Sequence, residues 1–224
     1  MDSSASAQLP IERFAALEAR PFVQHAFIAR VPGIDVASDK AEALRRLDGV
    51  HREVRQSLGV AEFPFITAEQ VHGREVAVVD EPVASDHRFD GCDGLVTNQV
   101  GLLLGIYVAD CGAVFLVDPV RRAIGLVHSG KKGTELGIVG NAIDLMRERF
   151  GSAPEDLIVQ LGPCIRPPHY EIDFAADVIR QSRERGVTSV HDNGVCTACD
   201  LDRYYSYRAE KSRTGRMLAL LAIV

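Results

Sequence analysis

Apolar residues along the chain fall mostly into short runs that are bounded by Gly, Asp or Pro. Runs of four to seven apolar residues between such breaks are typical of buried β-strands. The pattern predicts strands at residues 25–30, 65–68, 76–79, 94–97, 102–108, 114–117, 123–128, 157–161, 204–208 and 217–223.

Three longer segments show the spacing of an amphipathic helix instead. From Asp39, apolar residues recur on one face as far as Leu58, and Asp39 is suited to cap the helix. Residues 134–150 carry apolar side chains three and four apart, with Thr134 as the expected N-cap and Gly151 as the expected C-terminal glycine. Residues 174–185 form the third expected helix.

Strands and helices do not alternate steadily along the chain. That order favours an α+β (mixed α/β) fold over a doubly wound parallel sheet. We find no Pro/Gly/Ser-rich linker, so we expect one domain over residues 21–224, preceded by a loose N-terminal segment over residues 1–20.

Composition narrows the functional classes. The 224 residues include 25 Lys and Arg against 31 Asp and Glu, a formal charge of −6 that disfavours non-specific nucleic-acid binding. Five cysteines, an odd count, argue against a disulfide framework. The N-terminal residues lack the features of a signal peptide, and the apolar run at 217–224 is too short to span a bilayer. We expect a cytoplasmic protein without nucleic-acid or membrane partners; its oligomeric state stays open.

Candidate chemistry lies in three loops that follow expected strands: QVHG at 70–73, ADCG at 109–112 and HSGKKG at 128–133. If the fold joins them, His72, Cys111 and His128 form a good zinc set, with a fourth position open for a water whose pKa the metal would lower. Without metal, a histidine could instead deprotonate Cys111 for attack on a carbonyl. As a third alternative, Cys111 is a small buried apolar residue and the histidines are hydrogen-bonded loop residues.

The same loops could bind an anion. HSGKKG combines glycines, a helix N-terminus and the charges of Lys131 and Lys132, which suits phosphate. Arg208 and Arg216 belong to a C-terminal basic cluster that suits an anion equally well. The alternative for both groups is a solvated surface. Asp110, directly before Cys111, is a candidate for orienting a ligand or transferring a proton.

Two further features receive a structural interpretation. Cys196 and Cys199 form one C-x-x-C motif without a second pair, which is weak evidence for a zinc or redox site. His169 and His191 have no partner evident in the sequence, so we interpret them as surface histidines.

The sequence resembles the laccase-domain proteins, long named polyphenol oxidases and regarded as purine nucleoside phosphorylases with side activities. The matching motifs occur in the family's order over about residues 65–217. They are QVHG, CDGLVTN (92–98), ADC, HSGKKG, LGPCIRPPHYEI (161–172), CT (196–197) and YSYR with TGR (205–208 and 214–216).

The resemblance implies a single-domain fold like the catalytic domain of cytotoxic necrotizing factor, a cysteine hydrolase fold. It also implies zinc bound by His72, Cys111 and His128. The implied reactions are phosphorolysis of adenosine, inosine, guanosine and methylthioadenosine, and deamination of adenosine. An editing role on peptidoglycan precursors is attributed to bacterial members.

One loop departs from the family pattern H-A-G-W-R-G, because Ser129, Lys131 and Lys132 replace Ala, Trp and Arg. Lysine keeps the charge but lacks the planar fork of arginine. The chain has seven histidines but no His-x-His pair, so we expect zinc rather than copper and no multicopper laccase chemistry.

The resulting hypothesis is a zinc-dependent purine nucleoside phosphorylase, with a purine nucleoside and phosphate as partners. His72, Cys111 and His128 would be both ligands and catalytic residues, and Asp110 would assist them. Lys131, Lys132, Arg208 and Arg216 would bind phosphate. The alternatives are a metal-free cysteine hydrolase or amidase and a non-catalytic nucleoside-binding homologue.

Overall fold

The last strand shows why the chain forms layers. Every residue of β12 (Met217–Ile223) is apolar and buried. Met217, Ala219 and Leu221 contribute to one core, whereas Leu218 and Leu220 contribute to another. Successive side chains of a strand point to opposite faces, so this strand requires a packing layer on each side of its sheet.

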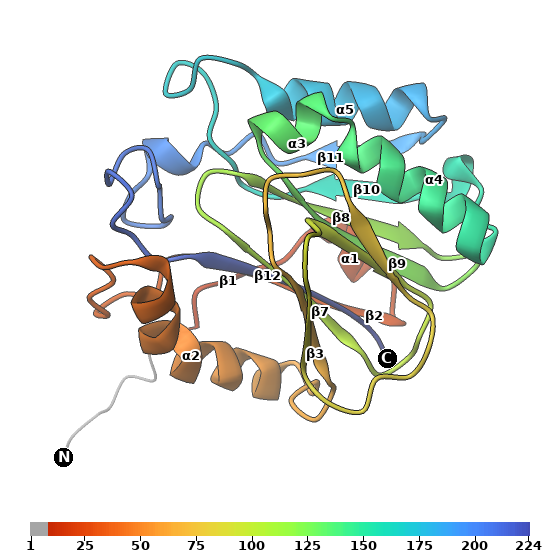
Figure 1. Cartoon of the computed structure of the whole chain (residues 1–224), viewed down its shortest axis with the longest axis horizontal. Coiled ribbons are helices and arrows are strands. Elements are labelled where there is room, and N and C mark those ends of the chain that lie inside the picture. Colours follow the sequence, from red (N-terminus) through yellow and green to blue (C-terminus); the bar gives the residue numbers. More distant parts are fainter. Residues whose placement is uncertain (1–8) are drawn as a thin grey trace.

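The computed structural model describes residues 9–224 and supplies those layers with two mixed six-stranded sheets (Figure 1). The first sheet has the order β1 (Ile11–Glu12), β2 (Val23–Ile28), β12, β7 (Leu103–Val108), β3 (Phe65–Ala68) and β5 (His87–Phe89). The second has the order β11 (Ser189–Asp192), β10 (Ile158–Leu161), β8 (Gly112–Asp118), β9 (Ala123–Ser129), β6 (Gly94–Thr97) and β4 (Val76–Val79).

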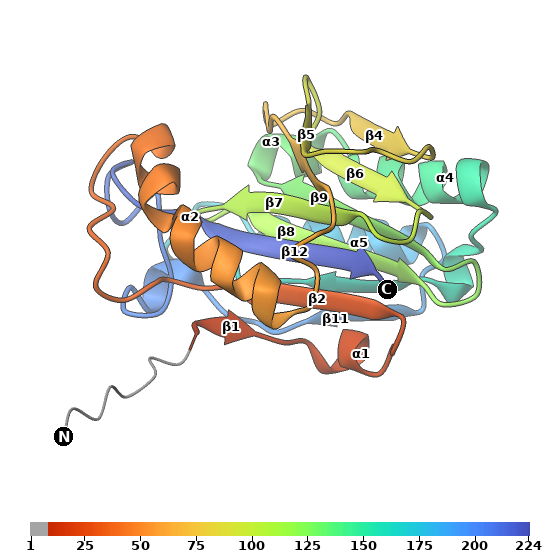
Figure 2. The same ribbon diagram turned by 90° about the horizontal axis from the view of Figure 1, so that it is seen from below.

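Helices cover the outer faces of the two sheets. Helix α2 (Lys40–Ser57) packs on the first sheet, where Val54 joins the core formed by β2, β7 and β12. Helices α4 (Ile138–Phe150) and α5 (Phe174–Glu184) pack on the second sheet. Figure 2, seen from below, shows α2 lying in front of β12 and β2 of the first sheet. The shorter helical elements are α1 (Ala15–Glu18), α3 (Lys131–Glu135) and the 3-10 turns η1 (Pro154–Asp156) and η2 (Thr197–Cys199).

The largest core lies between the two sheets. Phe27 and Ile106 enter it from the first sheet, and Phe115 and Leu126 enter it from the second. All four side chains are fully buried. The two sheets are therefore held face to face, and their loops can build a site together at one edge.

The sequence predicts the class and most elements of this fold. The mixed α+β class is confirmed, as are the strands at 65–68, 76–79, 94–97 and 217–223. Asp39 caps α2 by accepting hydrogen bonds from the backbone N–H groups of Ala41 and Glu42. Gly151 ends α4 in the left-handed conformation, with φ 70°. The expected likeness to cytotoxic necrotizing factor stays a prediction.

The expected helix at 134–150 is two helices. Gly137 has φ 78° and separates α3 from α4, and Thr134 lies inside α3 rather than capping a helix. The Thr134 hydroxyl instead bonds the Gly130 carbonyl and the Ser129 hydroxyl. The chain turns helical earlier than predicted because Gly130 already accepts the Thr134 N–H.

The strand expected at 204–208 is a turn. The backbone N–H of Tyr204 bonds Asp200, and the N–H of Glu210 bonds Ser206, both four residues back. The aromatic residues Tyr204 and Tyr205 suggest a strand because they are apolar. Both side chains are buried, but the backbone that carries them forms turns. Sequence reasoning also missed β1, α1, β5 and β11, which are short.

The segment at 9–20 is not loose. β1 pairs with β2, and Phe14 and Leu17 are buried in the core between the sheets. Their burial orders the segment. The rest of the expected loose segment, residues 1–8, lies outside the described residues. Among the helices of residues 9–224, none is both long and apolar enough to cross a membrane.

Candidate active site

Three loops from the two sheets meet at one edge of the sandwich. His72 follows β3 of the first sheet, Cys111 lies between β7 and β8, and His128 lies near the end of β9. One ligand atom from each of the three residues lies within 4.8 Å of the other two. The imidazole rings of His72 and His128 meet edge to face, with their centroids 4.8 Å apart. The strands therefore join a set that lies scattered in the sequence.

Strand register accounts for two of these contacts. β8 pairs antiparallel with β9, with Gly112 opposite Ser129, so Cys111 comes next to Gly130. A Cβ atom at Gly130 would lie 2.5 Å from the Cys111 Sγ. Only glycine leaves room for the sulfur there, so the packing of Cys111 requires a glycine at position 130.

The buried carboxylate of Asp93 holds two of the three loops. β6 pairs with β9 so that Asp93 lies beside His128, and the Asp93 Oδ1 accepts the His128 Nδ1–H at 2.8 Å. The same carboxylate accepts backbone N–H groups from Val71 at 3.1 Å, His72 at 2.8 Å and Gly73 at 2.7 Å. Asp93 is fully buried. It therefore fixes the QVHG loop and orients the His128 ring, so that Nε2 is the ring nitrogen left for the site.

Gln70 attaches the QVHG loop to the first sheet. Its side-chain amide donates to the Tyr107 carbonyl at 2.6 Å and accepts the Tyr107 N–H at 3.0 Å, as a neighbouring strand would. Gln70 and His72 have φ values of 67° and 61°, and Asp110 has φ 85°. Left-handed backbone at non-glycine residues costs energy and is concentrated at functional sites.

The electrostatics of the trio favour a thiolate. Burial disfavours the charged form of Cys111, but attraction to His128 and hydrogen bonds from His128 and His72 outweigh it and lower the pKa to about 6. Burial likewise opposes charge on His128, yet the Cys111 thiolate and the Asp93 carboxylate raise its pKa. In the metal-free protein these opposite pKa shifts favour a thiolate–imidazolium pair of Cys111 and His128.

A cavity of about 840 Å³ opens over the trio. That size is within the range of small-molecule sites. Its lining residues include the aromatic residues Tyr170, Phe174 and Tyr207. Its cations outnumber its acids, Asp110 and Glu135. The cations are Lys40, Lys131, Lys132, Arg208 and Arg216.

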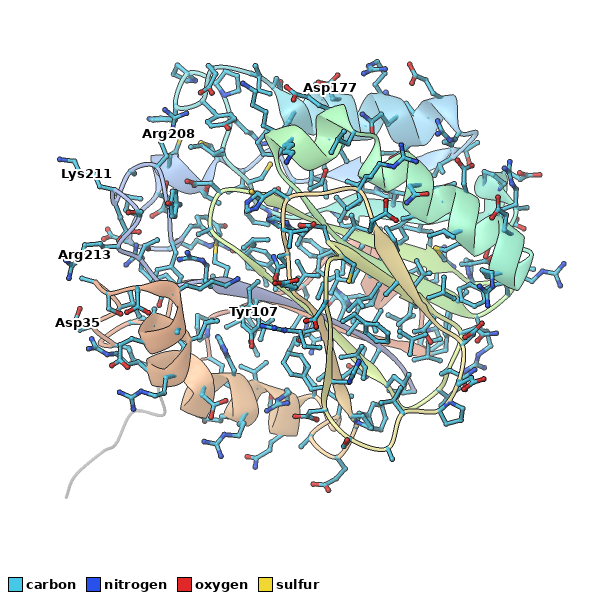
Figure 3. All side chains as sticks on the ribbon, in the orientation of Figure 1. Asp35, Tyr107, Asp177, Arg208, Lys211 and Arg213 are labelled. Atoms are coloured by element: carbon cyan, nitrogen blue, oxygen red, sulfur yellow. The ribbon has the colours of Figure 1, made fainter. Side chains whose placement is uncertain are left out.

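Two of the basic residues are held by Glu171. Arg208 donates to the Glu171 Oε2 at 2.6 Å, and the Lys131 Nζ lies 3.8 Å from Oε1. The Arg208 guanidinium also lies over the Tyr170 ring, 4.9 Å from its centroid. Figure 3 shows Arg208 at the edge of the molecule, on the loop before β12. Glu171 and Tyr170 thus position Arg208 at the rim of the cavity.

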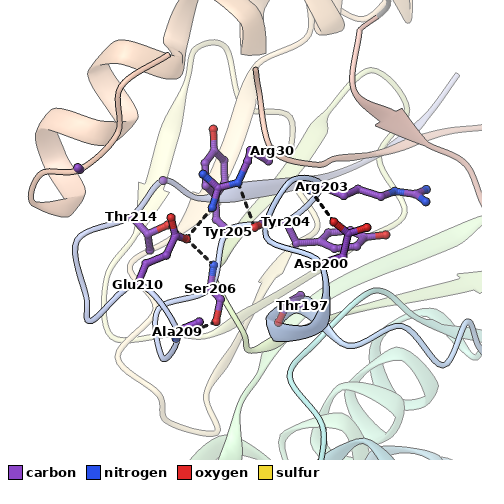
Figure 4. Close-up of polar contacts among 12 residues, drawn as sticks. Arg30, Thr197, Asp200, Arg203, Tyr204, Tyr205, Ser206, Ala209, Glu210 and Thr214 are labelled. Carbon is purple, nitrogen blue, oxygen red and sulfur yellow. Dashed lines mark hydrogen bonds and ion pairs between the residues drawn. The ribbon is translucent and has the colours of Figure 1, made fainter. Parts of the chain in front are cut away.

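Asp110 organises the C-terminal loop. Its carboxylate accepts the Thr197 hydroxyl at 2.7 Å, the Ser206 hydroxyl at 3.1 Å and the Arg208 N–H at 2.7 Å. The loop is closed on its other side by Glu210, which pairs with Arg30 and accepts the Ser206 N–H (Figure 4). This geometry supports a positioning role for Asp110.

All eight residues singled out from the sequence line one cavity: His72, Asp110, Cys111, His128, Lys131, Lys132, Arg208 and Arg216. Sequence reasoning assigned no individual role to Gln70 or Gly130, and it named Asp93 and Glu171 only as acids that could support or reach a site. Asp93 was one of several acids near the strands, and its place directly before a strand paired with β9 was the signal that could have separated it.

Comparison with known proteins relates most of the chain to one family. The model of the family described as multi-copper polyphenol oxidoreductase laccase matches residues 33–185 and 172–224. The purine nucleoside phosphorylase YlmD of Geobacillus stearothermophilus is 28% identical over 84% of this chain and 81% of its own. The purine nucleoside phosphorylase ORF3 of Streptomyces griseus is 31% identical over 75% of this chain and 78% of its own.

The fold is also similar to that of a solved relative. The crystal structure of YlmD from Geobacillus stearothermophilus aligns with 96% of this chain and 99% of its own, with a TM-score of 0.76 at 24% identity. The two sheets and their order along the chain are therefore a shared architecture.

The pKa of Cys111 can be tested in chelator-treated protein by following its alkylation with iodoacetamide between pH 5 and 10. A thiol with the usual pKa of 9.0 loses about tenfold in rate for each pH unit below that value. We expect Cys111 to keep its rate down to about pH 6 and lose it below. Mass spectrometry of the peptides separates Cys111 from Cys199, whose pKa is raised through its hydrogen bond with Cys196. A Cys111 midpoint near 9 would contradict the thiolate–imidazolium pair.

Proposed function

The chain belongs to the multi-copper polyphenol oxidoreductase laccase family, and from this premise we propose that it is a zinc-dependent purine nucleoside phosphorylase. The observation that carries the proposal is one cavity that combines a soft metal-ligand set with an excess of cations. Curated relatives named purine nucleoside phosphorylase support the same reaction class.

The donor set suits zinc. Two imidazoles and one thiolate are borderline-soft ligands, and three protein ligands leave one position for an exchangeable group. Gly130 leaves space beside the Cys111 sulfur, and the depressed pKa of Cys111 supplies the thiolate. One such site cannot hold a multicopper cluster, so the oxidase part of the family description does not extend to this chemistry. Bound zinc would act there as a Lewis acid beside the substrate.

Phosphate would bind among the cavity's cations. In phosphorolysis a phosphate oxygen forms a bond to C1′ of the ribose, and the C1′–N9 bond breaks as the purine leaves with a proton. Lys132 is exposed and has no acidic partner among its contacts in the described residues. Lys131 and Arg208 are preset by Glu171. Arg216 adds a charge at the wall. These side chains would hold the phosphate and balance its charge.

The aromatic wall suits the purine. Tyr170, Phe174 and Tyr207 line the cavity, and aromatic contacts favour flat heterocycles. The change from arginine to Lys132 keeps the charge without the fork, so we expect phosphate to be held less rigidly than in relatives with arginine. Adenosine, inosine, guanosine and methylthioadenosine are the candidate substrates, and adenosine deamination is a candidate side activity.

A second candidate function rests on the chain of contacts from Cys111 to His128 and from His128 to Asp93. His128 bonds the Asp93 carboxylate at 2.8 Å and stabilises the Cys111 thiolate, an order of groups that suits a cysteine hydrolase or amidase. His72 also contacts Cys111, and such a mechanism has no need of a second histidine on the thiolate. The extra histidine favours the metal proposal.

Incubation of zinc-loaded protein with adenosine, with and without phosphate, tests the reaction. We expect adenine and ribose 1-phosphate only when phosphate is present, measured by chromatography. Cys111→Ala should abolish zinc binding by the His72, Cys111 and His128 set and adenine release together, because it removes a ligand of that set. Phosphate-independent inosine would indicate deamination. Activity on amides that survives chelation and is lost on alkylation would favour the hydrolase, and nucleoside binding without product would favour the non-catalytic homologue.

Asp93→Asn tests how the ligands are oriented. The amide nitrogen cannot accept the N–H groups of the QVHG loop, and the charge that supports His128 is lost. We expect zinc affinity to fall about 10- to 100-fold, as for other residues that orient a ligand. Competition with a fluorescent chelator measures the change. Asp90→Asn is the matched control, because exposed Asp90 pairs only with Arg88 among the described residues. Equal affinities in the two variants would contradict the role of Asp93.

Lys132→Met tests the phosphate site. Loss of one unpaired cation at the cavity should raise the KM for phosphate about tenfold and leave the KM for the nucleoside near its original value. Steady-state kinetics with each substrate varied separately gives both constants. Lys211→Met, on the C-terminal loop but outside the cavity wall, is the control. A larger effect on the KM for the nucleoside than on the KM for phosphate would contradict phosphate binding at Lys132.

A further inference from the structure

A second cluster of metal-binding side chains lies apart from the trio at Cys111. The ligand atoms of His169, Cys196 and Cys199 all lie within 4.8 Å of one another. The His169 Nδ1 is 3.4 Å from the Cys199 Sγ and 3.8 Å from the Cys196 Sγ. The cluster assembles residues that the sequence alone assigned to a structural turn and to the surface.

These distances match the edges of a zinc coordination tetrahedron. With Zn–S near 2.3 Å and Zn–N near 2.0 Å, tetrahedral geometry places sulfur and nitrogen about 3.5 Å apart. The two observed separations lie on either side of that value. The three atoms thus surround a point that a single ion can reach without rearrangement of the backbone.

The backbone brings the two segments together without help from the side chains. Cys164 and Cys196 form an isolated parallel bridge. The Thr197 N–H donates to the Cys164 carbonyl at 3.2 Å, and the Cys164 N–H donates to the Val195 carbonyl at 3.3 Å. The turn η2 then presents both cysteines on one side, and a turn at Arg166 brings His169 over them.

We propose that His169, Cys196 and Cys199 bind a thiophilic d¹⁰ cation, with Zn²⁺ as the probe, as a second and structural site. Two thiolates and an imidazole are the ligands such ions prefer, and the two-residue spacing of the cysteines is typical of zinc turns. Binding displaces the two thiol protons to solvent. The fourth position faces outward, because His169 and Cys199 are exposed.

His169 distinguishes this proposal from a disulfide. A Cys196–Cys199 disulfide would use the two sulfurs alone and gives no reason for an imidazole nitrogen to lie against both. The distance in sequence from His169 to the cysteines is 27 and 30 residues, so local chain geometry does not force the contact.

The ion would fasten one wall of the cavity. His169 directly precedes Tyr170 and Glu171, which hold Arg208. On the other side of the site, the Thr197 hydroxyl bonds Asp110, the neighbour of Cys111 (Thr197 in Figure 4). The site would therefore cross-link the two segments that shape the anion-binding rim, at a place that touches no substrate.

Metal stoichiometry tests the proposal without an activity assay. Full-length protein is loaded with Zn²⁺ under reducing conditions, freed of loosely bound metal by gel filtration, and analysed by mass spectrometry for elements. We expect about two equivalents per chain for the original protein, and about one for His169→Ala, for Cys199→Ser and for Cys111→Ala. His191→Ala, an exposed histidine paired with Ser189, is the matched control and should keep both.

Cobalt distinguishes the two sites by their sulfur ligands. In Cys111→Ala protein loaded with Co²⁺, the near-ultraviolet absorption of sulfur-to-cobalt charge transfer should remain, and adding Cys199→Ser should weaken it. No zinc retained by Cys111→Ala, two equivalents in Cys199→Ser, or a Cys196–Cys199 disulfide that persists under the reducing conditions would overturn the proposal. Failure of the phosphorylase assay would leave it standing, because neither measurement depends on turnover.

Discussion

The buried Asp93 carboxylate is the interaction on which the site depends. A fully buried carboxylate is costly unless its oxygens accept hydrogen bonds, and Asp93 accepts three backbone N–H groups of the QVHG loop and the His128 ring. The cost of burying the charge is offset only when both partners are in place. One residue therefore couples the left-handed turn at His72 to the orientation of His128, and the second ring nitrogen of His128 becomes available to Cys111.

That coupling works because the two sheets are held rigidly. The trio draws His72 from the first sheet and His128 from the second, with Cys111 on the connection between them. A slip of one residue in the β8–β9 register would move Cys111 away from Gly130. The apolar core between the sheets thus fixes the site as well as the stability of the fold.

Sequence reasoning gave most elements of the fold because their signals are local. The strand MLALLAI and the helix cap at Asp39 can each be predicted from residues that are adjacent in the sequence. It failed where distant contacts decide: Tyr204 and Tyr205 look like strand residues, yet hydrogen bonds to Glu12 and from Val31 anchor them in a turn. The cluster of His72, Cys111 and His128 could be predicted because its residue types are chemically restrictive. Asp93 was not chosen, because an aspartate before a strand has many uses and only the register with β9 gives this one its role.

The role of His169 also depends on contacts between residues that are distant in the sequence. A histidine without partners nearby in the sequence is usually a surface residue, and a lone C-x-x-C is usually a turn; each interpretation is reasonable alone. Only the bridge between Cys164 and Cys196, which joins residues far apart in the chain, makes them neighbours.

The two clusters also differ in what surrounds them. The Cys111 trio lines a cavity and is held by a buried carboxylate, whereas the His169 cluster lies on the surface without a cavity wall among the described residues. A catalytic metal needs space for a substrate and ligands of fixed orientation, and a structural one needs only ligands from segments that must stay together. That contrast is why we propose a catalytic role for the first cluster and a cross-linking role for the second.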